Sequence, residues 1–393
     1  MPHSRPRHIL SQLLKRLKFS RVVSIQGSRQ VGKSFFAREL VKERLPKSLY
    51  VTLDKQRERD FARSNPESFI ESFEGTPLII DEAQKAPDLF DTIKWKVDEN
   101  PKPGQFLLLG STEFSKELQI RESLTGRLSR VRLYSMNLCE AEQHPLKSKP
   151  FSLLSEKPWV TRKTVLRHLE KGGFPGIFSI HESKLFQEAL TDWIRLTIER
   201  DLQQFPKTKV DSDLALKIFQ QLAVLEEPNN ANIARAVRCS ARTSQKILDL
   251  FQILFAVNKL NPHSLGTGKP LYFYCDVSLA SHFGADFKRK LWTWTLHEQL
   301  SQRSYLGDRN TRISYYRNSK GSMIHLVLEN NKNISPIKII DTEKWDSRDY
   351  EILKAFDKKA QREGKKISLL ALASSTLSLK NPKIEIYPFE ALA

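Results

Sequence analysis

The sequence has few cysteines and no long apolar run. Cys139, Cys239 and Cys275 are the only cysteines among 393 residues, and they lie far apart. Their odd number and wide spacing argue against a disulfide framework or a metal site and favour reduced thiols. No run approaches the roughly 20 apolar residues that a membrane-spanning helix needs, and the N-terminus lacks the apolar core of a secretory signal. We therefore expect a cytoplasmic protein without a transmembrane segment.

Acidic residues are also scarce relative to basic ones. The chain has 64 Lys and Arg against 45 Asp and Glu, a formal net charge of +19, and its first 21 residues contain no acid at all. Such an excess favours a polyanionic partner, with nucleic acid first and an acidic membrane surface second. A solvated basic surface without such a partner is the alternative. We expect DNA to be the partner of this basic surface.

The most informative stretch of the sequence is residues 22–34, V-V-S-I-Q-G-S-R-Q-V-G-K-S. An apolar strand, a glycine loop and an amphipathic helix follow one another in the order of a phosphate-binding loop. Gly27 and Gly32 let successive backbone N–H groups point at a polyphosphate. Lys33 would reach the β- and γ-phosphates, and the Ser34 hydroxyl would bind Mg²⁺. The predicted nucleotide-binding residues are Gly27, Ser28, Arg29, Gln30, Val31, Gly32, Lys33, Ser34 and Phe35.

A second nucleotide motif follows at P-L-I-I-D-E, residues 77–82. A short apolar strand ends there in two carboxylates. Asp81 would hold Mg²⁺ through its water shell, and Glu82 would orient and polarise the attacking water. This pattern is common by itself, but its position after a phosphate-binding loop makes it specific.

Two further residues are candidates for sensing or stabilising the γ-phosphate. The strand 105–110 ends at Ser111, whose hydroxyl could contact that phosphate. Arg127, with Arg130 as its neighbour, could stabilise transition-state charge in its own subunit or in a neighbouring one of a homo-oligomer. A surface ion pair is the alternative for either arginine. The predicted catalytic residues are Lys33, Glu82, Ser111 and Arg127.

The length of the chain suggests two or three domains. Residues 1–145 predict an α/β P-loop NTPase domain with a mostly parallel sheet and helices on both faces. Residues 160–286 predict a helical region in which a helix-turn-helix with basic side chains is typical of a winged helix, with an ordinary helical bundle as the alternative. Residues 287–393 predict a C-terminal α/β module with a mixed sheet.

The order of these pieces resembles a large prokaryotic family of AAA-type ATPases whose C-terminal region is known only as a domain of unknown function. The matching motifs are G-S-R-Q-V-G-K-S, P-L-I-I-D-E-A-Q-K-A-P, F-L-L-L-G-S-T, S-L-T-G-R, G-G-F-P, W-I-R-L-T-I-E-R-D-L and Y-Y-R-N-S-K-G. The resemblance implies ATP with Mg²⁺ as cofactor. The sequence has no N-K-x-D-like motif for guanine, which agrees with adenine.

In the resembled family, the C-terminal module is similar to a restriction-endonuclease fold, with two carboxylates and a lysine that bind a metal ion. Here His325, Lys338 and Ile340 stand at those three positions. Without paired carboxylates the site has no ligands for a hard cation. We expect a nuclease-like module that has lost its chemistry, unless an insertion shifts the register.

Four functions remain open from the sequence. The first is an ATPase that acts as a switch or motor with DNA. The second is a nucleotide-gated protein-interaction module that hydrolyses little. An active nuclease and a small-molecule kinase are the third and fourth, and both are disfavoured by the residues described above.

Overall fold

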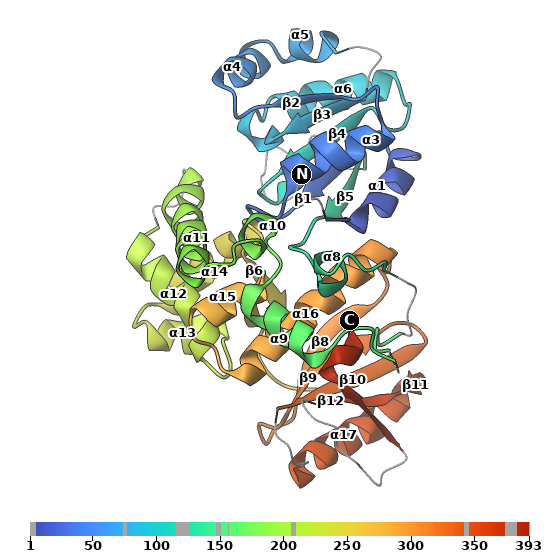
Figure 1. Ribbon diagram of the computed structural model, residues 1–393, viewed down its shortest axis with the longest axis vertical. Coiled ribbons are helices and arrows are strands. Elements are labelled where there is room, and N and C mark those ends of the chain that lie inside the picture. The colour runs from blue at the N-terminus through green and yellow to red at the C-terminus, as the bar shows by residue number, and fades with distance from the viewer. Residues whose placement is uncertain are drawn as a thin grey trace.

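The computed structural model describes residues 5–73, 77–114, 124, 126–146, 151–155, 157–205, 210–341, 346–373 and 383–392. Figure 1 shows three regions: a blue to cyan sheet with its helices at the top, a green to yellow helical region at the left, and an orange to red sheet at the bottom. The long helix α16 runs between them.

The first sheet has the strand order β2-β3-β4-β1-β5, and all its neighbouring strands are parallel. Its strands are β1 (Val22–Gln26), β2 (Leu49–Thr52), β3 (Leu78–Asp81), β4 (Phe106–Gly110) and β5 (Leu128–Arg132). Every residue of β1, β3 and β4 is buried. Continuous apolar strands of this kind form where helices cover both faces of a parallel sheet. The predicted P-loop NTPase fold is confirmed.

Two apolar clusters, one on each face, hold the helices against this sheet. Val23 and Ile25 of β1 belong to one cluster and Val22 to the other, because side chains alternate along a strand. The helical segments of this region are α1 (Ile9–Leu17), α2 (Lys33–Phe35), η1 (Phe36–Val41), α3 (Lys42–Arg44), α4 (Gln56–Ser64), α5 (Pro66–Glu71), η2 (Ala83–Lys85), α6 (Leu89–Glu99) and α8 (Leu138–Ala141).

The middle region is helical and ends in a short hairpin. Its elements are α9 (Arg162–Lys171), α10 (Pro175–Phe178), α11 (Ser183–Arg195), η4 (Leu196–Asp201), η5 (Leu202–Gln204), α12 (Ser212–Val224), α13 (Asn230–Ala236), α14 (Ala241–Ile253), β6 (Val257–Leu260), β7 (Leu271–Tyr274) and α15 (Val277–His282). Side chains of Asn229 and Ser240 cap α13 and α14 by accepting backbone N–H bonds. Three helices followed by a hairpin match the element order predicted for a winged helix, and membership of that class stays a prediction.

The C-terminal region is the predicted α/β module with a mixed sheet. It contains α16 (Phe287–Leu306), β8 (Arg312–Arg317), β9 (Met323–Glu329), β10 (Asn333–Ile340), α17 (Ser347–Ala360), η6 (Gln361–Glu363), β11 (Lys366–Ile367), β12 (Leu369–Ala373), β13 (Ile384–Pro388) and η7 (Phe389–Leu392). The strand order is β13-β12-β10-β9-β8, with β8, β9 and β10 antiparallel and β10, β12 and β13 parallel.

The predicted first and middle domains share a hydrophobic core. One buried cluster contains Ile25 of β1, Trp193 of α11, Phe251 of α14 and Tyr305 of α16. The boundaries predicted at residues 145, 160 and 286 therefore separate regions that pack closely, and they stay predictions. Among the described residues, no helix combines the length and the apolar character needed to cross a membrane.

Candidate nucleotide site

The loop of residues 27–32 connects β1 to α2 at the carboxyl edge of the parallel sheet. Gly32 has φ of 90°, a left-handed conformation that favours glycine. A Cβ atom on Gly27 would lie 2.1 Å from the backbone oxygen of Leu133, so only glycine fits there. Ser28 and Val31 are buried, and α2 begins at Lys33 and ends at Phe35. The loop therefore has the backbone that its sequence predicts.

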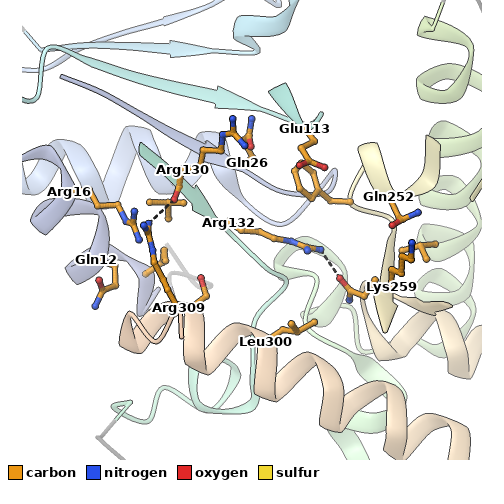
Figure 2. Close-up of a pocket in the computed structure, with 16 residues that line it drawn as sticks. Gln12, Arg16, Gln26, Glu113, Arg130, Arg132, Gln252, Lys259, Leu300 and Arg309 are labelled. Atoms are coloured by element: carbon orange, nitrogen blue, oxygen red, sulfur yellow. Dashed lines mark hydrogen bonds between the residues drawn. The ribbon is translucent and has the colours of Figure 1, made fainter. Parts of the chain in front are cut away.

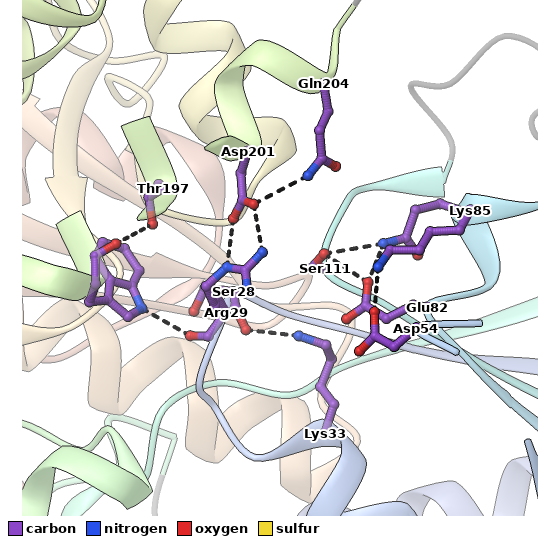
Figure 3. Close-up of polar contacts among 12 residues, drawn as sticks. Ser28, Arg29, Lys33, Asp54, Glu82, Lys85, Ser111, Thr197, Asp201 and Gln204 are labelled. Atoms are coloured by element: carbon purple, nitrogen blue, oxygen red, sulfur yellow. Dashed lines mark hydrogen bonds and ion pairs between the residues drawn. The ribbon is translucent and has the colours of Figure 1, made fainter. Parts of the chain in front are cut away.

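The Lys33 side chain turns back into this loop. It is buried, and its Nζ donates hydrogen bonds to the backbone oxygens of Gly27 (2.8 Å) and Ser28 (2.9 Å), as Figure 3 shows in part. Burial lowers the pKa of Lys33, while the carboxylates of Glu82 and Asp81 act to raise it. A buried ammonium held by carbonyl oxygens can exchange these acceptors for phosphate oxygens, which would stabilise its charge more strongly.

Asp81 ends β3 beside the loop, and a tyrosine that the sequence analysis did not select holds it. The buried Asp81 carboxylate accepts hydrogen bonds from the Tyr50 hydroxyl (2.5 Å) and from the backbone N–H of Glu82 (3.0 Å). Burial, followed by the bond to Asp81, raises the pKa of Tyr50, and the Ser34 side chain acts in the opposite direction. The phenol thus faces both predicted Mg²⁺ ligands, an oxygen-rich set that suits this hard ion.

Glu82 and Ser111 meet at the ends of neighbouring strands. The Ser111 hydroxyl donates to Glu82 Oε2 at 3.3 Å, and Gln84 Nε2 donates to the same oxygen at 2.5 Å and to Ser111 Oγ at 3.2 Å. Glu82 itself has φ of 56°, an uncommon left-handed conformation for a glutamate. Sequence reasoning missed Gln84, although it lies within the D-E-A-Q run of the second motif.

An ion pair joins the loop to the helical region. Arg29 donates from Nε and Nη2 to the two Asp201 carboxylate oxygens, at 2.7 and 2.6 Å, and this bond chiefly raises the pKa of Arg29. Trp193 Nε1 donates to the Arg29 backbone oxygen at 3.0 Å. Figure 3 shows Asp201 above the loop. Asp201 thus pairs with the loop and not with a neighbouring helix.

The N-terminal segment also contacts the loop. Arg7 is buried, and its guanidinium donates to the backbone oxygens of Val31 (2.6 Å) and Tyr134 (2.6 Å) and lies 3.3 Å from the Glu140 carboxylate. A Cβ atom on Gly32 would lie 3.5 Å from both Arg7 and Pro175. Sequence reasoning gave Arg7 no role in the loop, since a contact across 24 residues leaves no local pattern.

Arg127 does not join this site within its own chain, which corrects that part of the prediction. It precedes β5, whose first residue Leu128 pairs with Val22 at the start of β1. The loop follows the other end of β1, roughly 13 Å of strand away. Arg127 instead forms a bidentate ion pair with Asp98 of α6, at 2.6 and 2.7 Å. The surface ion pair was the alternative for this residue, and a role toward a neighbouring subunit stays a prediction.

The three nuclease-like positions lie on two adjacent strands of the C-terminal sheet, beside a cavity of about 330 Å³. His325 Nδ1 accepts the backbone N–H of Ile339 at 2.9 Å, and burial, then Lys338, keeps its pKa well below the usual value. Lys338 pairs with Asp349 at 2.8 Å. Within the described ranges, no three His, Cys, Asp or Glu residues are grouped so that they could hold a metal ion.

Family models match two parts of the chain. Residues 19–142 match the model of an AAA domain. The chain therefore carries an AAA-type P-loop domain. Residues 162–288, the helical region after this AAA domain, match a domain of unknown function (DUF8612).

Curated relatives of this chain come from two mycobacteria. They are the uncharacterized proteins Mb2031c of Mycobacterium bovis and Rv2008c of Mycobacterium tuberculosis, each 26% identical over 266 residues. The match covers 67% of this chain and 55% of each relative, so the chain spans about half their length. A solved structure, the Walker-type ATPase PABY2304 of Pyrococcus abyssi, is 12% identical with a TM-score of 0.43 and covers 70% of this chain and 94% of that one.

Proposed function

We propose that the AAA domain binds ATP with Mg²⁺ at residues 27–35 and hydrolyses it. One observation carries this proposal: Lys33, Asp81, Glu82 and Ser111 follow or end three neighbouring strands at one edge of the parallel sheet. Figure 3 shows Lys33, Glu82 and Ser111 of this group. Lys33 would bind the β- and γ-phosphates, and Ser34 and Asp81 would hold Mg²⁺. The ion neutralises phosphate charge when it is bound.

Glu82 acts as the residue that orients the attacking water. Its carboxylate is held by the donors Gln84 and Ser111, which fix its direction and leave its second oxygen, Oε1, for the water. Ser111 is well placed to exchange this bond for one to the γ-phosphate. Because Glu82, Gln84 and Ser111 are already ordered, less free energy is needed to arrange them for the attack of water.

The second candidate is a nucleotide-gated switch that hydrolyses little. It is favoured by the 2.5 Å bond from Gln84 to Glu82, which occupies the carboxylate that would act on water. In such a switch, bound ATP fixes the domain arrangement through the pair between Arg29 and Asp201. The two candidates differ in turnover and share the binding site.

Steady-state ATP hydrolysis by three variants separates these candidates. Lys33→Ala should abolish nucleotide binding, because the charge at the phosphates is lost. Glu82→Gln should keep ATP affinity within a few-fold and lower turnover at least 100-fold, about 2.7 kcal/mol of barrier. Glu67→Gln, an exposed position in α5, is the matched control and should change neither quantity.

Unchanged ATP affinity in Lys33→Ala would contradict the site itself. Tight ATP binding with no turnover by the unaltered chain would favour the switch over the ATPase. Hydrolysis that persists in Glu82→Gln would remove Glu82 from its proposed role while the binding site stands.

DNA is the partner we propose, and one surface favours it. Arg235 and Arg238 near the end of α13, with Arg242 and Lys246 on α14, are all exposed where a helix-turn-helix would meet a duplex. Phosphate contacts of this kind predict an affinity that falls steeply with salt. Duplex DNA should therefore bind in low salt and stimulate hydrolysis. Hydrolysis indifferent to DNA would point to a protein or membrane partner instead.

Two further proposals concern assembly and location. In a homo-oligomer, Arg127 or Arg130 would act on the nucleotide of a neighbouring subunit, which would require Arg127 to leave Asp98. A location in the cytoplasm is supported by Cys139, Cys239 and Cys275, which are not joined to one another in disulfides.

A further inference from the structure

A second pocket, of about 410 Å³, lies beside β5, the edge strand of the parallel sheet. Figure 2 shows its side chains coming from α1, β5, the β6 segment and the end of α16, so three regions of the chain enclose it. None of residues 27–34 lines this pocket, which makes it separate from the nucleotide loop. Its volume falls in the range of small-ligand sites, roughly 300–1,000 Å³.

Five of the polar side chains that line this pocket are cationic. Arg130, Lys259 and Arg309 are exposed and form its rim, whereas Arg16 and Arg132 lie deeper. Glu113 is the one carboxylate among its described lining residues. Five cations around a concave space create a positive potential that attracts multiply charged anions.

Neutral groups orient the arginines of the pocket. Arg16 Nη1 donates to Ser129 Oγ at 2.8 Å, Arg132 Nη2 to Asn258 Oδ1 at 2.8 Å, and Arg309 Nη2 to the Arg130 backbone oxygen at 3.5 Å. No ion pair with a described carboxylate neutralises any of them. Their positive charges are therefore held in place without being compensated.

Two buried donors of the pocket lack hydrogen-bond partners. Gln26 is 4% exposed and Arg16 is 9% exposed, and neither Gln26 Nε2 nor Arg16 Nε has a partner in the described structure. Buried polar atoms in native proteins are usually paired, so each orphan calls for a ligand or a water molecule. Both residues line the pocket together with the oriented arginines.

We propose that this pocket binds a small ligand that carries two or more phosphate groups. Five of its side chains are cationic and can only donate hydrogen bonds. Phosphate oxygens are acceptors that guanidinium groups bind in pairs. Several separated cations fit a polyphosphate better than a single carboxylate or sulfate. A nucleic-acid strand would need a long groove along its backbone, whereas the orphaned donors line a pocket of about 410 Å³, the size of a small-ligand site.

Titration of the Lys33→Ala variant with tripolyphosphate tests the proposal. This background removes the phosphate-binding lysine of the nucleotide loop, so that the second pocket is measured alone. We expect one binding site per chain by calorimetry in low salt. Adding Arg130→Gln and Arg309→Gln should weaken binding at least tenfold, and both positions are exposed, so the chain should still fold.

Arg44→Gln with Arg57→Gln is the matched control, because it removes two exposed charges of the same domain outside the pocket. Its affinity for tripolyphosphate should equal that of Lys33→Ala alone. No binding to Lys33→Ala, or an equal loss in both double-arginine variants, would overturn the proposal. Tight binding of an oligothymidylate that tripolyphosphate cannot displace would overturn it too. Each result is independent of ATP hydrolysis.

Discussion

At the scale of single residues, Tyr50 positions the Asp81 carboxylate beside the nucleotide loop. Its hydroxyl donates to Asp81, and its ring lies under Arg38, whose guanidinium carbon is 6.0 Å from the ring centre. The bond fixes one carboxylate oxygen of Asp81. The other oxygen is bonded by the backbone N–H of Glu82. Asp81 therefore has a fixed orientation before any ion binds, which reduces the cost of ordering the metal site.

Replacement of Tyr50 by phenylalanine should weaken Mg²⁺ use and spare the fold. The ring and its contact with Arg38 remain, while the hydroxyl that positions Asp81 is lost. We expect the Mg²⁺ concentration for half-maximal ATP hydrolysis to rise about tenfold, with little change in turnover at saturating Mg²⁺. A magnesium titration at fixed ATP measures both quantities. An unchanged Mg²⁺ concentration for half-maximal hydrolysis would show that Tyr50 does not position Asp81.

The residues that could be selected from the sequence belong to short motifs of consecutive residues. Lys33 and Glu82 could be selected because the loop and the D-E pair each occupy a few consecutive residues after an apolar strand. Asp201 could not be selected, since its partner Arg29 is 172 residues away. Arg127 was selected as a catalytic candidate from its motif. The pairing of β5 with β1 places it at the edge of the sheet opposite the loop, and this pairing cannot be read from the sequence.

At the scale of elements, the fully buried strands are the ones that the sequence predicts best. The strands β1, β3 and β4 are buried throughout and could be read as apolar runs. By contrast, the π-helical turns η1 and η4 leave no signature in composition. The second of them ends at Asp201, so the irregular turn lies where the helical region contacts the nucleotide loop. Irregular helices are often found at functional positions.

The helix α16 contains an unusual number of buried polar side chains. Glu298 accepts the backbone N–H of Leu138 at 2.8 Å, and His297 Nε2 lies 2.9 Å from the Ser135 hydroxyl. Trp294 Nε1 donates to His168 of α9 at 3.1 Å. Burial lowers the pKa of His168 to about 4 and that of His297 to about 3. Both imidazoles are therefore neutral in the folded chain at neutral pH.

These two histidines should make the fold sensitive to mild acid. Below the unfolded value of about 6.5, the unfolded chain binds protons that the folded chain does not, so stability falls as pH decreases. Each histidine should contribute a slope of about 1.4 kcal/mol per pH unit between roughly pH 6.5 and 4, and none above this window. Urea unfolding at several pH values measures the slope.

The variant His168→Gln should remove one of these contributions, because glutamine keeps an acceptor for Trp294 and does not titrate. His181→Gln, at an exposed position, is the control and should leave the slope unchanged. If the free energy of unfolding depends on pH equally in His168→Gln and in the unaltered chain, His168 does not contribute to the acid sensitivity.

At the scale of the whole molecule, the nucleotide loop is connected to both other regions. Arg29 reaches Asp201 in the helical region, and Arg7 links the loop to the Glu140 carboxylate and the Tyr134 backbone. The Tyr305 hydroxyl of α16 accepts a hydrogen bond from the Tyr134 backbone N–H at 3.2 Å. A buried chain of contacts thus runs from the loop to the long helix that begins the C-terminal module.

We expect ATP to stabilise this chain of contacts and the long helix with it. In the unaltered protein, Mg²⁺-ATP should slow amide hydrogen exchange both in the loop and in the second half of α16. Arg7→Lys keeps the charge beside Glu140, but an ammonium cannot bond the Val31 and Tyr134 oxygens in the fixed geometry of a guanidinium. At equal ATP occupancy, exchange in α16 should then become nearly insensitive to nucleotide, while the loop remains protected. Equal protection of α16 in both proteins would mean that the coupling runs through the helical region, which contacts the loop at Asp201 and Trp193.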